Sequence, residues 1–168
     1  MPDKLSPSMV FQTGEVQYRV PKVPVAVELV LTGGARVLGN LHVLPQAGLH
    51  EGRERVIEIL NAPDPFVPIT SGPEGSLVHK RHIVLARVGS PEDAGLTEVD
   101  LACNPSIDVD VRLAGLPPVR GSLRIDQPPG HVRLLDHVNA AEEFFPVVTA
   151  DGAAIVARRH VVEIRQIT

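Results

Sequence analysis

The chain has 168 residues, of which 43% are hydrophobic, and it carries a formal net charge of −4. This hydrophobic fraction supports a folded core and excludes a chain that is disordered overall, and the lack of net positive charge argues against a dedicated duplex-DNA-binding protein. A single cysteine, Cys103, excludes an intrachain disulfide and the clustered thiolates of a structural zinc site.

Aromatic residues make up only 3% of the chain, so the core must be built from Val, Leu and Ile. These residues favour strands when they alternate with polar ones, which predicts a β-rich protein. Residues 1–12 lack the apolar stretch of a secretory signal, and no run approaches the roughly 20 apolar residues of a membrane span. We therefore expect a cytoplasmic protein with no membrane partner.

The first predicted strands follow an N-terminal extension, residues 1–22, in which 10–20 is compatible with an additional edge strand. Residues 25–29 alternate apolar and polar positions with a period of two, the pattern of a half-buried strand. After a turn at 32–34, a second strand is predicted at 37–43. A glycine inside that strand, Gly39, suggests a bulge or a sharp bend.

Further along, residues 55–61 fit either a short strand or a helix. Residues 66–69 contain a proline and predict the start of a strand or an edge strand. Two more short strands are expected at 77–78 and 83–85, separated by a tight turn. Residues 89–107 are predicted to be a linker, in which 96–101 could pair as an extra strand.

The same pattern then recurs. Residues 55–87 align without a gap to residues 133–165, at an offset of 78 (139 − 61), with ten identities in 33 pairs. Upstream, 25–29 corresponds to 109–113 and 39–43 to 121–125, so a second strand glycine, Gly121, matches Gly39. We infer a tandem duplication with one module at 23–88 and another at 108–168.

Comparing the two copies indicates a helix at 55–61 and 133–139. The positions i, i+1 and i+4 stay apolar in both copies, whereas Ile59 is replaced by His137, so one helical face is retained. Asn61 and Asn139 fit the left-handed residue that often ends a helix. We interpret six repeated positions as structural: Arg55, Asn61, Phe66, Arg133, Asn139 and Phe144.

Each module therefore contains five short strands and one short helix. So few short strands bury little surface as a flat sheet, which favours a small, strongly bent barrel. The predicted fold class is all-β, with two tandem five-stranded small barrels. Such small barrels are marginal alone, so pairing of the copies or wider oligomerisation is expected to add buried surface and to cover strand edges.

The order of these elements resembles the Sm-like small-barrel fold. The resemblance is carried by the strand glycine, the insertion before the third strand, and the motifs Val78–Ile83 and Val156–Val161. These motifs occupy the place of the family's apolar-Arg-Gly segment, with Arg-His in place of Arg-Gly. The stretch 55–68 also resembles an uncharacterised group of bacterial Sm-like proteins. The resemblance implies the small-barrel fold. It leaves RNA binding open, because the loop with which the family contacts RNA has no counterpart here.

The candidate ligand-binding residues lie on the two repeated basic turns. On a tight turn their side chains would project together, where they could bind phosphate or carboxylate groups. The alternative interpretation is that they are solvated turn residues. These residues are Lys80, Arg81, His82, Arg158, Arg159 and His160.

The sequence contains no G-x-S-x-G, P-loop or dinucleotide-binding motif. Its seven histidines show no metal-ligand spacing, and the Gly33-Gly34 pair is expected to form a turn. Glu58 and Asp136 are expected to form helix-surface ion pairs. We therefore predict a protein with no enzymatic activity, no metal and no cofactor.

The leading functional hypothesis is a non-catalytic assembly or ligand-binding module that self-associates through strand edges, for example as a trimer forming a six-module ring, or that binds a protein partner. The alternative is an RNA-binding protein that uses the two basic turns.

Overall fold

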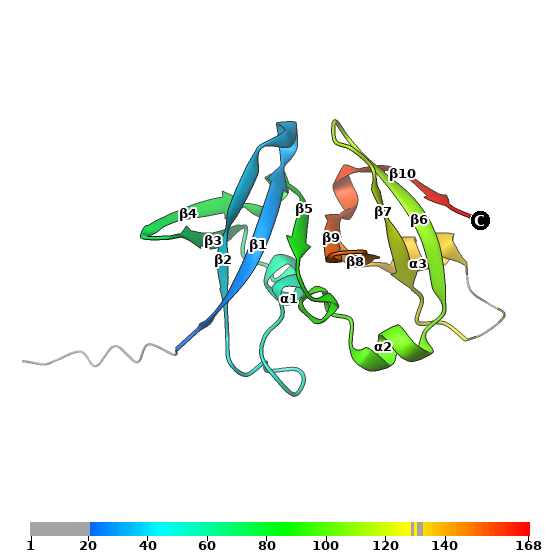
Figure 1. The fold of residues 1–168 in the computed structure, drawn as a ribbon, viewed down its shortest axis with the longest axis horizontal. Helices are drawn as coiled ribbons and strands as arrows, with labels where there is room; N and C mark the ends of the chain where they lie inside the picture. The colour runs from blue at the N-terminus through cyan, green and yellow to red at the C-terminus, as the bar shows by residue number, and fades with distance from the viewer. Residues whose placement is uncertain (1–20, 129, 131–132) are drawn as a thin grey trace, which may run out of the picture.

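The computed structural model describes residues 21–128, 130 and 133–168. These residues form one antiparallel sheet of ten strands accompanied by three short helices (Figure 1). The predicted all-β class is therefore confirmed at the level of a mostly β protein. The predicted strand at 10–20 lies outside the described residues. None of the described helices is long and apolar enough to cross a membrane.

The elements run in the same order through both halves of the chain. The first half comprises β1 (Val23–Leu31), β2 (Arg36–Val43), α1 (Val56–Asn61), β3 (Phe66–Ser71), β4 (Glu74–His79) and β5 (Ile83–Val88). α2 (Glu98–Cys103) connects it to the second half. The second half comprises β6 (Ser106–Leu113), β7 (Val119–Arg124), α3 (Leu134–Ala140), β8 (Phe144–Thr149), β9 (Gly152–Ala157) and β10 (Val161–Gln166).

Strand pairing also follows one scheme in both halves. The sheet order is β10-β6-β7-β8-β9-β5-β1-β2-β3-β4, so the fifth strand of each half pairs with the first, and the fourth strand lies at the other end. The halves meet where β5 pairs with β9. The described sheet is not closed into two separate barrels. It ends at β4 on one side and at β10 on the other, as Figure 1 shows.

Two glycines allow the sheet to bend where the second strand of each half meets the third. A Cβ atom on Gly39 would overlap the carbonyl oxygen of Thr70, and a Cβ atom on Gly121 would overlap that of Val148. Only one residue pair is registered between β2 and β3, and one between β7 and β8. The predicted strand glycines therefore serve a close backbone crossing.

Neither half builds a core from its own residues alone. The core of the first half includes Phe144 and Ile155, which belong to β8 and β9 of the second half. The core of the second half includes Val84 and Leu85 of β5. Because each core borrows side chains across the β5–β9 junction, the two halves stabilise each other.

The structure corrects two predictions about local conformation. Residues 96–101 do not form a strand, because Thr97 caps the start of α2 with a hydrogen bond from the backbone nitrogen of Asp100. Asn61 and Asn139 are not left-handed: all described residues with positive φ are glycines, and both helices are followed by an extended alanine. The asparagine at the end of α1 has a different role, described below.

We expect Gly39→Ala and Gly121→Ala each to lower the free energy of unfolding by at least about 1–3 kcal/mol, since the added methyl group meets backbone that cannot move aside. Gly48→Ala is the matched control, because a Cβ atom at Gly48 meets open space. Urea unfolding followed by circular dichroism measures the difference. Equal stability of the three variants would contradict the close crossing.

Candidate functional site

The most distinctive site in the molecule is the junction between its two halves. Four residue pairs join β5 to β9, all of them apolar or small except Arg87. The pairs are Leu85 with Val156, Ala86 with Ile155, Arg87 with Ala154, and Val88 with Ala153. Removal of this apolar surface from water stabilises the junction, and the ladder fixes its register.

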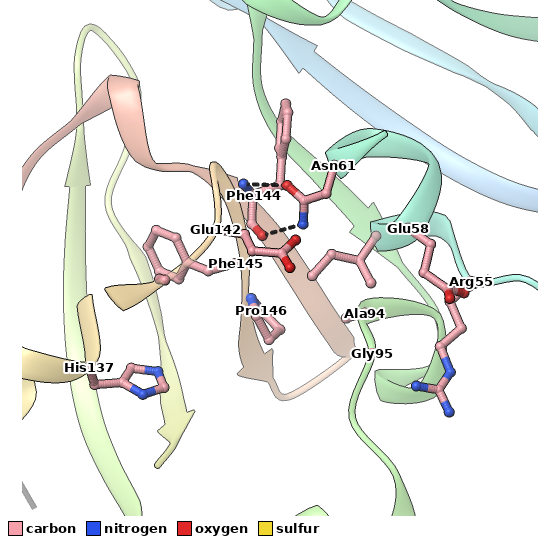
Figure 2. A pocket seen from close by; sticks show the side chains of 12 residues that line it. Arg55, Glu58, Asn61, Ala94, Gly95, His137, Glu142, Phe144, Phe145 and Pro146 are labelled. Atoms are coloured by element: carbon pink, nitrogen blue, oxygen red, sulfur yellow. Dashed lines mark hydrogen bonds between the residues drawn. The ribbon is translucent and has the colours of Figure 1, made fainter. Parts of the chain in front are cut away.

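A side-chain clamp reinforces the junction beyond the ladder. The Asn61 side chain at the end of α1 faces the backbone of Phe144, the first residue of β8 (Figure 2). Its amide nitrogen donates to the Phe144 carbonyl oxygen at 2.9 Å, and its amide oxygen accepts from the Phe144 nitrogen at 2.9 Å. One amide group thus satisfies both backbone groups of Phe144, as a neighbouring strand would.

A pocket of about 340 Å³ lies beside this clamp, between α1 and β8. Figure 2 shows Arg55 and His137 on opposite sides of it. Glu58 in its wall is held by the imidazole of His50 at 2.9 Å and by the backbone nitrogen of Arg55. Hydrogen bonds to Glu51 and Glu58 raise the pKa of His50, while burial lowers the pKa of His137.

Part of the pocket wall is already engaged in the local structure. Its Glu58 carboxylate is already bound at the start of α1, and much of its remaining lining is apolar, including Ile57, Phe145 and Pro146. Within the described part of the chain, no group of three or more His, Cys, Asp or Glu side chains is placed to hold a metal ion. We interpret the pocket as a gap that remains where the two halves of the chain pack together.

The first residue of each predicted basic turn stabilises a helix. Lys80 is buried, and its Nζ donates to the carbonyl oxygens of Ile59 at 2.6 Å and Ala62 at 2.9 Å, at the C-terminal end of α1. Arg158 likewise donates to the carbonyl oxygen of Ala141 at 2.7 Å, next to the end of α3. Desolvation lowers the pKa of Lys80. A cation at this position binds carbonyl groups that the helix leaves unpaired.

The other four predicted residues lie where the two turns meet. The His160 imidazole contacts the Arg81 carbonyl oxygen at 2.9 Å, which places the turns side by side. Arg159 is paired with Glu143 at 2.6 Å, and the His82 ring lies 3.2 Å from the Thr32 hydroxyl. The exposed Arg81 guanidinium makes no hydrogen bond or ion pair with any residue that the structure describes.

The six predicted ligand-binding residues therefore divide into two groups. Lys80 and Arg158 are engaged by carbonyl groups at the helix ends, whereas Arg81 and His160 form the contact between the turns and His82 and Arg159 are the residues next to them in the chain. That this second group binds a ligand stays a prediction.

The six positions interpreted as structural have unequal surroundings. Arg55 and Arg133 precede α1 and α3, and Asn61 contacts Phe144. Asn139 and Phe66 make no hydrogen bond with each other or with Asn61 and Phe144, and the Phe66 ring packs edge-on against that of His79. Sequence reasoning missed the clamp. The one sign of it in the sequence was that both copies have an asparagine five residues before a phenylalanine.

In comparisons with known proteins, no family model, no curated sequence and no solved structure matched this chain. Its function must therefore be argued from its own geometry.

We expect Lys80→Met to lower the free energy of unfolding by about 2 kcal/mol, since it removes two hydrogen bonds from a charged group to part-buried carbonyl groups while keeping an apolar side chain of similar length. The control is Arg81→Met at the adjacent exposed position, with an expected change of less than about 0.5 kcal/mol. Thermal and urea unfolding measure both. A larger loss at Arg81 than at Lys80 would reverse the assignment of roles.

Proposed function

We propose that the protein is a non-catalytic assembly module made of two Sm-like small-barrel modules, which self-associates by adding β10 of one copy to β4 of the next. The matching strand order of the two halves and the sharp crossings at Gly39 and Gly121 support this description. The proposal extends the β5–β9 junction, which joins a fifth strand to a fourth strand inside one chain, to the two strands that end the sheet.

One comparison carries the proposal. Leu77 in β4 is 71% exposed, whereas its equivalent at the offset of 78, Ile155 in β9, is 0% exposed because β5 and the core of the first half cover it. An apolar side chain of this size at an open strand edge favours pairing with another strand. The β3–β4 hairpin (66–79), here named the arm, extends away from the rest of the molecule (Figure 1).

At the opposite end of the sheet, a side chain of β10 is also more exposed than its equivalent in the internal junction. Val84 in β5 is 1% exposed, while its equivalent in β10, Val162, is 63% exposed. β10 pairs with β6 on one side and with no described strand on the other. β4 in the arm of one copy could thus supply the second partner strand that β10 of another copy lacks among the described residues.

The internal junction predicts the register of the external one. Paired residue numbers across β5 and β9 sum to 241, as for Leu85 and Val156, and shifting one member by +78 and the other by −78 keeps that sum. The expected pairs are Glu163 with Val78, Ile164 with Leu77, Arg165 with Ser76, and Gln166 with Gly75.

Charge also fits this register. Glu74 of β4 would lie diagonally opposite Arg165 of β10, whose guanidinium already contacts Asp110 at 3.2 Å, and would add a second carboxylate beside it. Both edge strands are more polar than β5 and β9, as strands exposed in the free chain need to be to resist aggregation. We therefore expect association to be reversible and dependent on concentration.

Such an association is head to tail, because it joins two different surfaces. Head-to-tail contacts close into rings when the rotation between copies permits and otherwise continue as filaments. A closed trimer would contain six modules, which is the ring given as an example in the sequence-based hypothesis.

The test is size-exclusion chromatography with light scattering over a range of concentrations. The native protein is expected to exceed the 18.0 kDa of one chain, and Leu77→Lys to return it to that mass. Leu38→Lys is the matched control, because Leu38 is similarly exposed on β2 and lies away from both sheet ends. A native mass of one chain at every concentration would contradict the proposal, as would equal effects of the two variants.

A second candidate function, single-stranded RNA binding, is favoured by the contact between the basic turns. His160 holds the two turns together, and the Arg81 guanidinium is exposed beside them. If these turns bind phosphate groups, Arg81→Ala combined with Arg159→Ala should reduce binding of a fluorescent oligonucleotide and flatten its salt dependence. The assembly proposed above should survive the same double variant. If the affinity for the oligonucleotide changes neither with salt nor with the substitutions, this candidate function is wrong.

A further inference from the structure

The clamp between Asn61 and Phe144 has an unmatched counterpart in the same chain. At the offset of 78, Asn61 is equivalent to Asn139 at the end of α3, and Phe144 is equivalent to Phe66 at the start of β3. Phe144 is 2% exposed and Phe66 is 49% exposed. Asn139 is exposed too, and its side chain makes no hydrogen bond with any described residue.

We propose that Asn139 of one copy clamps the backbone of Phe66 in the next copy, so that α3 is the specific receptor for the arm. This inference rests on the proposed strand addition and names the residue that selects the partner. The Asn139 amide nitrogen would donate to the Phe66 carbonyl oxygen, and its amide oxygen would accept from the Phe66 nitrogen, as Asn61 does for Phe144.

The surface of α3 fits this role, because it lacks the cover that α1 receives. In α1, Val56 and Leu60 are buried, and Ile57 packs against the core that contains Phe144. The equivalents of Val56 and Leu60 in α3 are only half-buried. Leu135, the equivalent of Ile57, is largely exposed. An arm docked from another copy would cover α3 as the β8–β9 hairpin covers α1.

The clamp also gives the assembly a direction. Pairing β4 with β4, or β10 with β10, would satisfy the strand edges but would leave Asn139 without Phe66. Only a head-to-tail contact places α3 of one copy beside the arm of another. Asparagine is suited to this selection, because its amide offers a donor and an acceptor together.

The first experiment compares the same substitution at the two equivalent asparagines. Asn139→Asp keeps the shape and one acceptor but removes the donor and sets a negative charge against a carbonyl oxygen. We expect it to weaken self-association by about tenfold or more, with unchanged unfolding of the dilute chain. Asn61→Asp should instead destabilise the single chain, because its partner lies within that chain.

The second experiment mixes two defective variants. Leu77→Lys has a blocked arm and an intact α3, whereas Asn139→Asp has an intact arm and a blocked α3. Each alone should remain at the mass of one 18.0 kDa chain at a concentration where the native protein associates. Together they can form one complete junction, so the mixture should yield a dimer containing one chain of each and nothing larger.

The outcomes separate this inference from the proposal on which it rests. If Asn139→Asp associates like the native protein while Leu77→Lys does not, the clamp is wrong and strand addition stands. A native protein that never associates removes both. Loss of single-chain stability in Asn139→Asp would make the residue structural and overturn the clamp, and so would a mixture that remains at the mass of one chain.

Discussion

The pairing of β5 with β9 is the interaction on which the rest of the structure depends. Through it, Phe144 and Ile155 enter the core of the first half, and Val84 and Leu85 enter that of the second. Neither core is complete without the other half, as expected for small β modules that bury little surface alone. The Asn61 amide adds a polar lock at the edge of this apolar contact, which fixes where β8 begins.

The same pairing scheme leaves a strand at each end of the described sheet with one neighbour only. A junction that joins a fifth strand to a fourth strand uses one of each, so β4 and β10 each lack a second partner among the described strands. Leu77 and Val162 on these strands are exposed, and the Asn139 side chain makes no hydrogen bond with any described residue. The polar residues interspersed along β4 and β10 distinguish these ends from the apolar internal junction, and in the proposed assembly they would favour a reversible contact over a permanent one.

Sequence periodicity predicted the local elements well, because alternation and helical spacing are local properties. Comparison of the two copies assigned α1 and α3 as helices, and the strand glycines marked real crossings. Contacts between distant segments could not be obtained in this way: Asn61 and Phe144 are 83 residues apart. Lys80 and Arg81 look alike in the sequence, and only burial separates a helix-stabilising lysine from an exposed arginine. The optional strand at 96–101 was wrong, because Thr97 and Asp100 form a capping interaction that starts α2 inside the connecting segment.

The most direct test of the central claim is a disulfide cross-link in the predicted external register. In a Cys103→Ser background, chains carrying Leu77→Cys are mixed with chains carrying Ile164→Cys, oxidised and separated by mass. A covalent dimer of one chain of each type is expected, because these two positions should face each other across β4 and β10. A pair displaced by one residue, Ser76→Cys with Ile164→Cys, should cross-link far less. Cross-linking that is absent, or equal for the two pairs, would contradict the claim that the external contact repeats the internal one.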